Sequence, residues 1–337
     1  MNYNKRDDYT ASDAMTDALV KAGVTHLFVN TGTDYPPIIE SWAKYEIEGR
    51  EKPEIIISPH ESVAMSAAQA FAMATGRPQG VFVHVDVGTQ NIGGALHNAF
   101  RCRVPVFILA GLSPYTMEGE LPGGRNSNIQ FLQDPRDQAG IVRSYTKHES
   151  DLKTGKNIQQ MIYRALQIAK SDPPGPVYMT ATREVLEEEG WDVDADMAEW
   201  APVAPTALDP ESVETLASAL VGAKNPLIIT AYLGRNEEAV AELVKLSERL
   251  AIPVAESTKS YMNFPTGNPM SLGGSMSRAL AEADVILVID CDTPWLPQSA
   301  KAVEGSRVFV LDIDPVKEQI PLWHIPAERS ILLHFIA

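Results

Sequence analysis

The hydrophobic positions in the first half of the chain alternate between helical spacing and short continuous apolar runs. Met15, Ala18, Leu19 and Ala22 fall at positions i, i+3, i+4 and i+7, which predicts a helix that ends before Gly23. The apolar runs predict strands at His26–Val29, Ile55–Ile57, Val81–Val85, Val106–Leu109 and Val177–Thr180, with helices near residues 34–46, 61–75, 90–101 and 155–170. Near-continuous apolar strands that alternate with helices indicate a parallel sheet covered on both faces.

The second half of the chain repeats this alternation after a change in composition. Residues 189–206 are rich in acidic residues and proline, and we interpret them as a solvated linker. Asp209 followed by Pro210 predicts the start of a helix. Later strands are expected at Leu227–Thr230, Val285–Asp290 and Arg307–Asp312. The sequence therefore predicts an α/β fold with two doubly wound parallel-sheet domains, at residues 1–188 and 207–337.

Length, charge and cysteine content narrow the class of protein. The 337 residues suffice for two domains of about 150 residues each, and no apolar run is long enough to cross a membrane. A formal net charge of −16 argues against nucleic-acid binding, which needs clustered basic residues. Cys102 and Cys291 are too few for a disulfide framework or a cysteine zinc site. We expect a cytoplasmic protein without nucleic-acid or membrane partners.

Glu61 stands where the predicted strand Ile55–Ile57 passes into a largely apolar helix. Ligands of open α/β sheets bind beyond the carboxyl ends of the strands, so this position suits a functional carboxylate. A first-turn glutamate that complements the helix dipole is the structural alternative. His60-Glu61 does not begin a zinc-protease motif, because Ala64 stands where the second histidine would be.

A second strand-to-helix junction runs from His84 to Asn91 and turns at Gly88. The chain contains neither the glycine pattern of dinucleotide-binding folds nor that of the P-loop, which argues against a nicotinamide dehydrogenase. His84 lies in a predicted buried strand, so we interpret it as a core histidine.

The order of several motifs is more specific than any one of them. They are Phe28-Val29-Asn30-Thr31-Gly32, His60-Glu61-x-x-Ala64, Ala74-Thr75-Gly76-Arg77-Pro78, Gly88-Thr89-Gln90-Asn91, and Arg103-Val104-Pro105-Val106 with Ala110-Gly111. Over residues 10–185 the chain resembles the pyrimidine-binding domain of thiamine-diphosphate enzymes of the acetolactate synthase and pyruvate decarboxylase type. Two departures are Thr31 in place of the family's proline and Asp86-Val87 in place of its Gly-Pro.

The resemblance implies roles for particular residues. Glu61 would hydrogen-bond N1′ of the aminopyrimidine and so promote formation of the tautomer that activates the thiazolium carbon. Thr31, Gly32, Gly88 and Asn91 would line the cofactor site. Gln133, in Phe131-Leu132-Gln133-Asp134, resembles a glutamine that faces the substrate, with a surface loop residue as the alternative.

The second domain resembles the family's Rossmann-like central domain, through Ile252-Pro253-Val254-Ala255, Leu272-Gly273-Gly274 and Asp312-Ile313-Asp314-Pro315. The Gly-Met-His-Gly segment of FAD-carrying members is absent, so no FAD is expected. The family's third domain holds the diphosphate through Mg²⁺ with a Gly-Asp-Gly…Asn-Asn motif, but the chain has no Gly-Asp and no Asn-Asn dipeptide. We therefore expect no metal ligands here and a second polypeptide or fragment that carries that domain, in a dimer or tetramer of the complete unit.

These observations predict part of an acetolactate-synthase-like enzyme that decarboxylates a 2-keto acid and transfers the aldehyde unit. A 2-keto acid decarboxylase or lyase of the same superfamily is the alternative. A non-catalytic regulatory or binding paralogue is the alternative from another class: Glu61 argues against it, while Thr31 and Asp86-Val87 leave it open.

Overall fold

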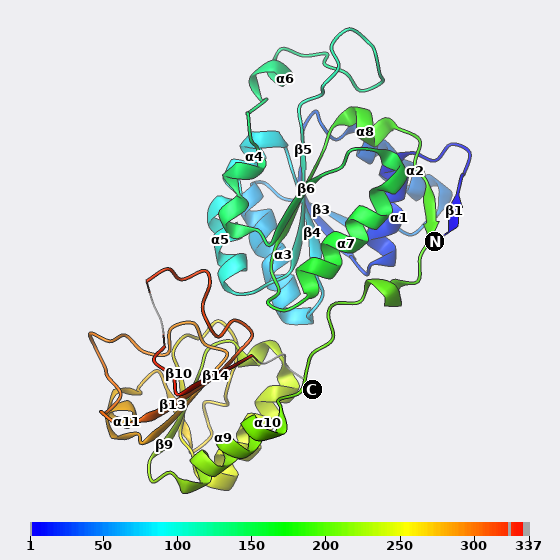
Figure 1. Ribbon diagram of the computed structural model, residues 1–337. Helices are drawn as coiled ribbons and strands as arrows, with labels where there is room; N and C mark the ends of the chain where they lie inside the picture. The colour runs from blue at the N-terminus through cyan, green and yellow to red at the C-terminus, as the bar shows by residue number, and fades with distance from the viewer. Residues whose placement is uncertain (1, 323–324, 333–337) are drawn as a thin grey trace. The chain divides into compact units, whose positions relative to one another are not determined.

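The computed structural model describes residues 2–322 and 325–332, so the last five residues of the expected second domain lie outside the described part. The chain divides into two compact units, Met1–Val203 (unit 1) and Ala204–Ala337 (unit 2). Figure 1 draws both, and each is described by itself.

Unit 1 is built on a six-stranded sheet in the order β3-β2-β4-β5-β7-β6, in which every pair of neighbouring strands is parallel. Its strands are β2 (His26–Asn30), β3 (Glu54–Ile57), β4 (Gln79–Val83), β5 (Val106–Gly111), β6 (His148–Asp151) and β7 (Val177–Ala181). Its helices are α1 (Ala11–Lys21), α2 (Pro36–Glu48), α3 (Glu61–Thr75), α4 (Val85–Asn91), α5 (Gly93–Arg101), α6 (Ile129–Leu132), α7 (Ile158–Lys170) and α8 (Arg183–Glu187), with 3-10 turns at Ala139–Ile141, Arg143–Tyr145, Gly155–Asn157 and Met197–Trp200.

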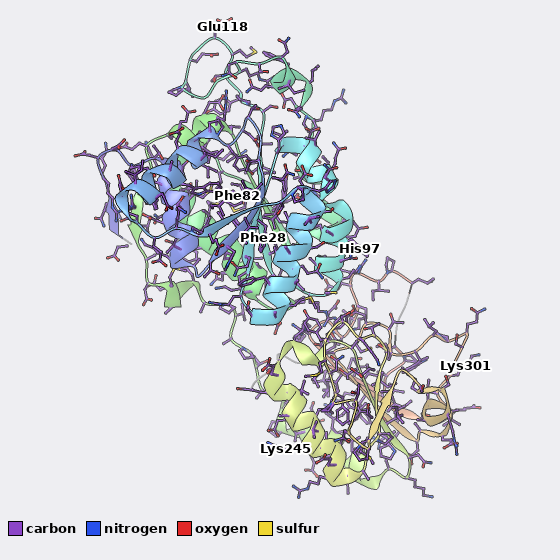
Figure 2. All side chains as sticks on the ribbon, turned by 180° about the vertical axis from the view of Figure 1, so that it is seen from behind. Phe28, Phe82, His97, Glu118, Lys245 and Lys301 are labelled. Atoms are coloured by element: carbon purple, nitrogen blue, oxygen red, sulfur yellow. The ribbon has the colours of Figure 1, made fainter. Side chains whose placement is uncertain are left out.

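Helices cover both faces of this sheet, as Figure 1 shows. One core cluster packs α1 and α7 on the face that carries Phe82, and the other packs α3 and α5 on the face that carries Phe28. Figure 2 shows both phenylalanines inside unit 1. The α/β fold and its parallel sheet, predicted from the apolar runs, are thereby confirmed.

Local sequence signals set the helix ends. Thr10 caps α1 in a capping box with Asp13, and α3 begins after His60, whose ring accepts the Ser62 amide, and ends at Gly76 in the left-handed conformation. These features hold the first residue of α3, Glu61, at a defined point beyond the carboxyl end of β3.

Two expected elements differ from the structure. The predicted strand Val81–Val85 ends at Val83, because Val85 takes a φ of 31° and its N–H turns to the Asp34 carboxylate. Left-handed backbone at a β-branched residue is strained. The helix expected near residues 90–101 is two helices, and the first of them, α4, begins at Val85.

The segment 189–206, expected as a linker, is partly ordered within unit 1. Strand β8 (Asp192–Asp194) pairs antiparallel with β1 (Asn2–Asn4), and the buried Asp192 carboxylate pairs with Arg6 and Lys21. The acidic residues of this segment therefore include one that stabilises unit 1.

Unit 2 has its own six-stranded sheet in the order β11-β10-β9-β12-β13-β14, again with only parallel pairs. The strand order reverses at β9 and β12, the arrangement of a Rossmann-like sheet. Its elements are α9 (Pro210–Gly222), β9 (Pro226–Thr230), a 3-10 turn at Leu233–Arg235, α10 (Glu237–Leu250), β10 (Val254–Glu256), β11 (Ser271–Gly273), α11 (Ser277–Glu282), β12 (Val285–Ile289), β13 (Arg307–Asp312) and β14 (Arg329–Leu332). Asp209 caps α9 as predicted, whereas the strand expected at Val285–Asp290 ends one residue earlier.

In the described part of the chain, no helix combines the length and apolar character needed to cross a membrane.

Candidate functional site

The predicted site residues lie at the carboxyl ends of three adjacent strands of unit 1. Thr31 and Gly32 follow β2, Glu61 follows β3 at the start of α3, and Gly88 and Asn91 belong to α4 beyond β4. Because parallel strands end at the same edge of a sheet, these residues share one side of unit 1.

Glu61 is buried, with 7% of its surface exposed, and its carboxylate is held by a neighbouring helix. The Asn91 side-chain amide donates a hydrogen bond of 2.9 Å to Glu61 Oε2. His60 Nδ1 lies 3.9 Å from the same oxygen on a more exposed ring. Among the described residues no group donates a hydrogen bond to Oε1. Oε2 is therefore held by Asn91, while Oε1 can accept a hydrogen bond from a ligand.

Gly88 brings the α4 backbone against this carboxylate. A Cβ at Gly88 would stand 3.0 Å from Val83 Cβ and 3.4 Å from Glu61 Oε1. A side chain there would fill the space beside Oε1. The structure therefore brings together three predicted residues, Glu61, Gly88 and Asn91.

Gly32 serves a different neighbour. A Cβ at Gly32 would lie 2.3 Å from His84 Nδ1, so the glycine leaves room for this imidazole. Thr31 is half-buried, and in residues 2–322 and 325–332 its side chain makes no hydrogen bond. The structure thus joins neither residue directly to Glu61.

His84 is a candidate functional residue rather than the core histidine that its strand pattern suggested. Its ring is half-buried, and Nδ1 lies 2.6 Å from Asp34 Oδ1. The other Asp34 oxygen accepts the Val85 N–H at 3.2 Å. Asp34 is 50 residues away along the chain, so no local sequence signal indicated the pair.

The His84 ring lines an open cavity beside the β2 and β4 ends, together with Gln133. The cavity has about 210 Å³ of empty space, part of which is open to solvent. Gln133 thus lines the same cavity as His84, and its role at the substrate stays a prediction.

The hydrogen bond to Asp34 is the main cause that raises the pKa of His84, while partial burial acts in the opposite direction. We expect Asp34→Asn to lower this pKa, because it removes the carboxylate that stabilises the imidazolium. The pKa of His84 is higher in the folded state than in the unfolded state. The His84–Asp34 pair therefore stabilises unit 1 fully at pH values below the unfolded-state pKa of the histidine. This stabilisation is lost as the pH rises through the folded-state pKa. Imidazole NMR titration measures the shift. Asp86→Asn, a weaker contributor, serves as the control and should change it less.

Gly111 leaves room for the Asp34 side chain of the His84–Asp34 pair. A Cβ at Gly111 would stand 1.8 Å from Asp34 Oδ2. We expect Gly111→Ala to destabilise unit 1 by about 1–3 kcal/mol in denaturant unfolding, the usual cost of overpacking. Gly94→Ala is the matched control, since a Cβ there meets nothing within 4 Å and alanine favours a helix. Equal stability of the two variants would contradict the packing argument.

The described residues contain no group of three His, Cys, Asp or Glu side chains placed to hold a metal ion.

Two known protein families match the sequence of this chain. The family description "Thiamine pyrophosphate enzyme, N-terminal TPP binding domain" matches residues 9–141, and "Thiamine pyrophosphate enzyme, central domain" matches residues 213–321. The chain belongs to the thiamine-diphosphate-dependent enzyme superfamily.

Relatives within the superfamily include enzymes named for different activities. Acetolactate synthase of Bacillus subtilis is 23% identical over 327 residues, covering 95% of this chain and 51% of the relative. Benzoylformate decarboxylase of Pseudomonas aeruginosa is 26% identical over 305 residues, covering 83% of this chain and 51% of the relative. The chain thus spans about half the length of these superfamily members.

A solved superfamily structure confirms the fold. The thiamine diphosphate-dependent 4-hydroxybenzoylformate decarboxylase of Rhodococcus jostii superposes with a TM-score of 0.78 at 22% identity, covering 96% of this chain and 60% of that one. At this identity the likeness concerns the fold alone.

Proposed function

We propose that this chain supplies the aminopyrimidine-binding part of a thiamine-diphosphate enzyme that acts on a 2-keto acid, with acetolactate-synthase-like decarboxylation and aldehyde transfer. The observation that carries the proposal is the buried Glu61 carboxylate, held through Oε2 by Asn91 and open beside Gly88 at Oε1. The space that a Gly88 side chain would fill suits a flat ring edge. These residues fit the pyrimidine end of the cofactor.

Within this proposal Glu61 binds and orients the cofactor ring by sharing a proton with N1′ through Oε1. Asn91 holds Oε2, which orients the carboxylate so that Oε1 points toward the ring nitrogen. Gly88 has no side chain that would block the approach of the ring. When bound, thiamine diphosphate supplies a carbon nucleophile for addition to the 2-keto group and an electron sink for decarboxylation. General acid–base help from a positioned side chain contributes about 10²–10⁴ in rate.

The proposal includes a second polypeptide or fragment that carries the diphosphate and Mg²⁺ site. A charged hydrogen bond from Glu61 contributes about 1.5–3 kcal/mol, whereas micromolar affinity needs about 8.2 kcal/mol. The net charge of −16 disfavours a diphosphate without a cation.

The test is a titration of thiamine diphosphate with Mg²⁺, first into the chain alone and then into the complex that co-purifies from its source cells. Saturable micromolar binding only in the complex, with CO₂ release from pyruvate, is the expected result. Micromolar binding by the chain alone would overturn the need for a partner. A complex that binds no cofactor would overturn the enzyme proposal in favour of a non-catalytic role.

The His84–Asp34 pair favours a second candidate, a 2-keto acid decarboxylase. Such an enzyme must deliver a proton to the carbon that has lost CO₂, and an imidazole with a raised pKa at a small cavity can hold that proton. Product analysis separates the two reactions, because a decarboxylase releases the free aldehyde while a synthase forms a new carbon–carbon bond.

A further inference from the structure

A long loop, residues 112–128, leaves the carboxyl end of β5 and forms one wall of the His84 cavity through Leu112, Ser113 and Pro114. Figure 2 shows Glu118 at its outer end, away from the sheet. The two limbs of the loop meet where the Arg125 amide donates to the Thr116 carbonyl at 2.8 Å.

Two consecutive residues of α8, Arg183 and Glu184, hydrogen-bond to the backbone of this loop. Glu184 Oε1 accepts the amides of Tyr115 and Thr116 at 2.8 and 2.9 Å. The Arg183 guanidinium donates to the carbonyls of Gly123, at 3.0 Å, and Gly124. One residue therefore holds the outgoing limb and the other holds the returning limb.

Arg183 also lines the cavity, although only 7% of the residue is exposed. Its remaining contacts, at 3.4 Å, are with the Thr33 carbonyl and the Asn126 side-chain oxygen. Every acceptor that it contacts in the described part of the chain is thus a neutral oxygen. A buried cation without a carboxylate on its guanidinium retains a strong preference for an anion.

Three acidic groups lie near this cation, and one of their oxygens, Glu184 Oε2, is buried without a hydrogen-bond partner among the described residues. Asp34 is occupied by His84 and the Val85 amide, and Glu184 Oε1 by the loop. Glu187, the third carboxylate, is exposed. Arg183, His84 and Asp34 all line the cavity, and because Asp34 is paired with His84, Arg183 is the basic group there without a carboxylate on it.

We propose that Arg183 binds the carboxylate of the 2-keto acid and that the substrate displaces the Gly123 and Gly124 carbonyls from the guanidinium. The inference rests on the proposed function for its substrate class. A carboxylate forms a stronger, charge-assisted pair with the guanidinium than the two neutral carbonyls do, so this exchange frees the returning limb of the loop from Arg183.

The experiment titrates pyruvate, and separately its neutral methyl ester, into the isotope-labelled full chain without cofactor. NMR reports millimolar binding through the Arg183 Nε–H and the Gly123 and Gly124 amides. We expect pyruvate to shift these signals and the ester to leave them unchanged. Arg183→Gln should weaken pyruvate binding by about tenfold or more, the usual effect of losing a charged hydrogen bond. Arg183→Lys should keep the preference for the acid.

Arg125→Gln is the matched control. Arg125 holds the same loop through the Pro114 carbonyl at 2.6 Å, but its side chain does not line the cavity. This variant should therefore bind pyruvate as the unaltered chain does. Equal shifts with acid and ester in the unaltered chain, an absence of shifts, or an equal loss in the Arg125 and Arg183 variants would overturn the proposal. No cofactor enters this test, so its failure is distinct from failure of the proposed function, which the thiamine diphosphate titration detects.

Discussion

Glu61→Gln is expected to lower the turnover of the complete enzyme by about 10²–10⁴-fold while leaving unit 1 folded. The amide keeps the shape of the side chain and can still accept the Asn91 hydrogen bond, but it cannot share a proton with the cofactor ring. Steady-state kinetics of the complex under saturating thiamine diphosphate and Mg²⁺ measures the effect. Asn91→Ala, which frees Oε2, should give a smaller loss.

Glu237→Gln is the matched control for the structural alternative. Glu237 is the first residue of α10, as Glu61 is of α3, and it is exposed. If Glu61 only complements its helix dipole, both substitutions should cost about 0.3–1 kcal/mol of stability and neither should alter turnover. Turnover of Glu61→Gln within threefold of the unaltered enzyme would contradict the proposed role.

The second large effect concerns the stability of unit 2. Lys317 and Asp312 are both buried, and the ammonium contacts Asp312 Oδ2 at 2.6 Å and Asp292 Oδ1 at 3.1 Å. We expect Lys317→Met to destabilise unit 2 by about 3–5 kcal/mol, because the buried carboxylate then lacks the Lys317 charge. Denaturant unfolding followed by a unit 2 signal measures the loss, with unit 1 unchanged.

Two further variants test this explanation. Lys245→Met removes an exposed lysine that is paired on the surface with Glu242 and should change stability by less than about 0.5 kcal/mol. Lys317→Met combined with Asp312→Asn should recover part of the loss, since it removes the buried charge as well. A double variant as unstable as the single one would show that packing of the lysine stem, rather than its charge, stabilises unit 2.

Much of the fold could be predicted because the signals are local. Apolar runs such as Val106–Leu109 report strands buried on both faces, and Asp209-Pro210 reports a helix start. β6 escaped prediction because the run His148–Asp151 is polar and lies at the sheet edge. The left-handed conformation of Val85 was not predicted, because a hydrogen bond from its backbone N–H to the distant Asp34 carboxylate, rather than its β propensity, decides it.

The candidate site divides in the same way. The roles of Glu61, Gly88 and Asn91 were predicted from motif order, and the structure brings the three together; their function stays a prediction. The His84–Asp34 pair and the hold of Arg183 on Gly123 join residues 50 and 60 positions apart. Neither interaction can be predicted from local sequence patterns, because its partners are distant along the chain.

By itself the sequence determined the alternation of strands and helices, the family resemblance and the glutamate at the start of α3, because propensity, capping and motif order act over a few residues. Only the tertiary structure decided which side chains share the cavity. The strand order places β2 between β3 and β4, and this adjacency sets Asp34 against His84. Electrostatic and packing partners depend on distance in space, which the strand order fixes and spacing along the chain does not.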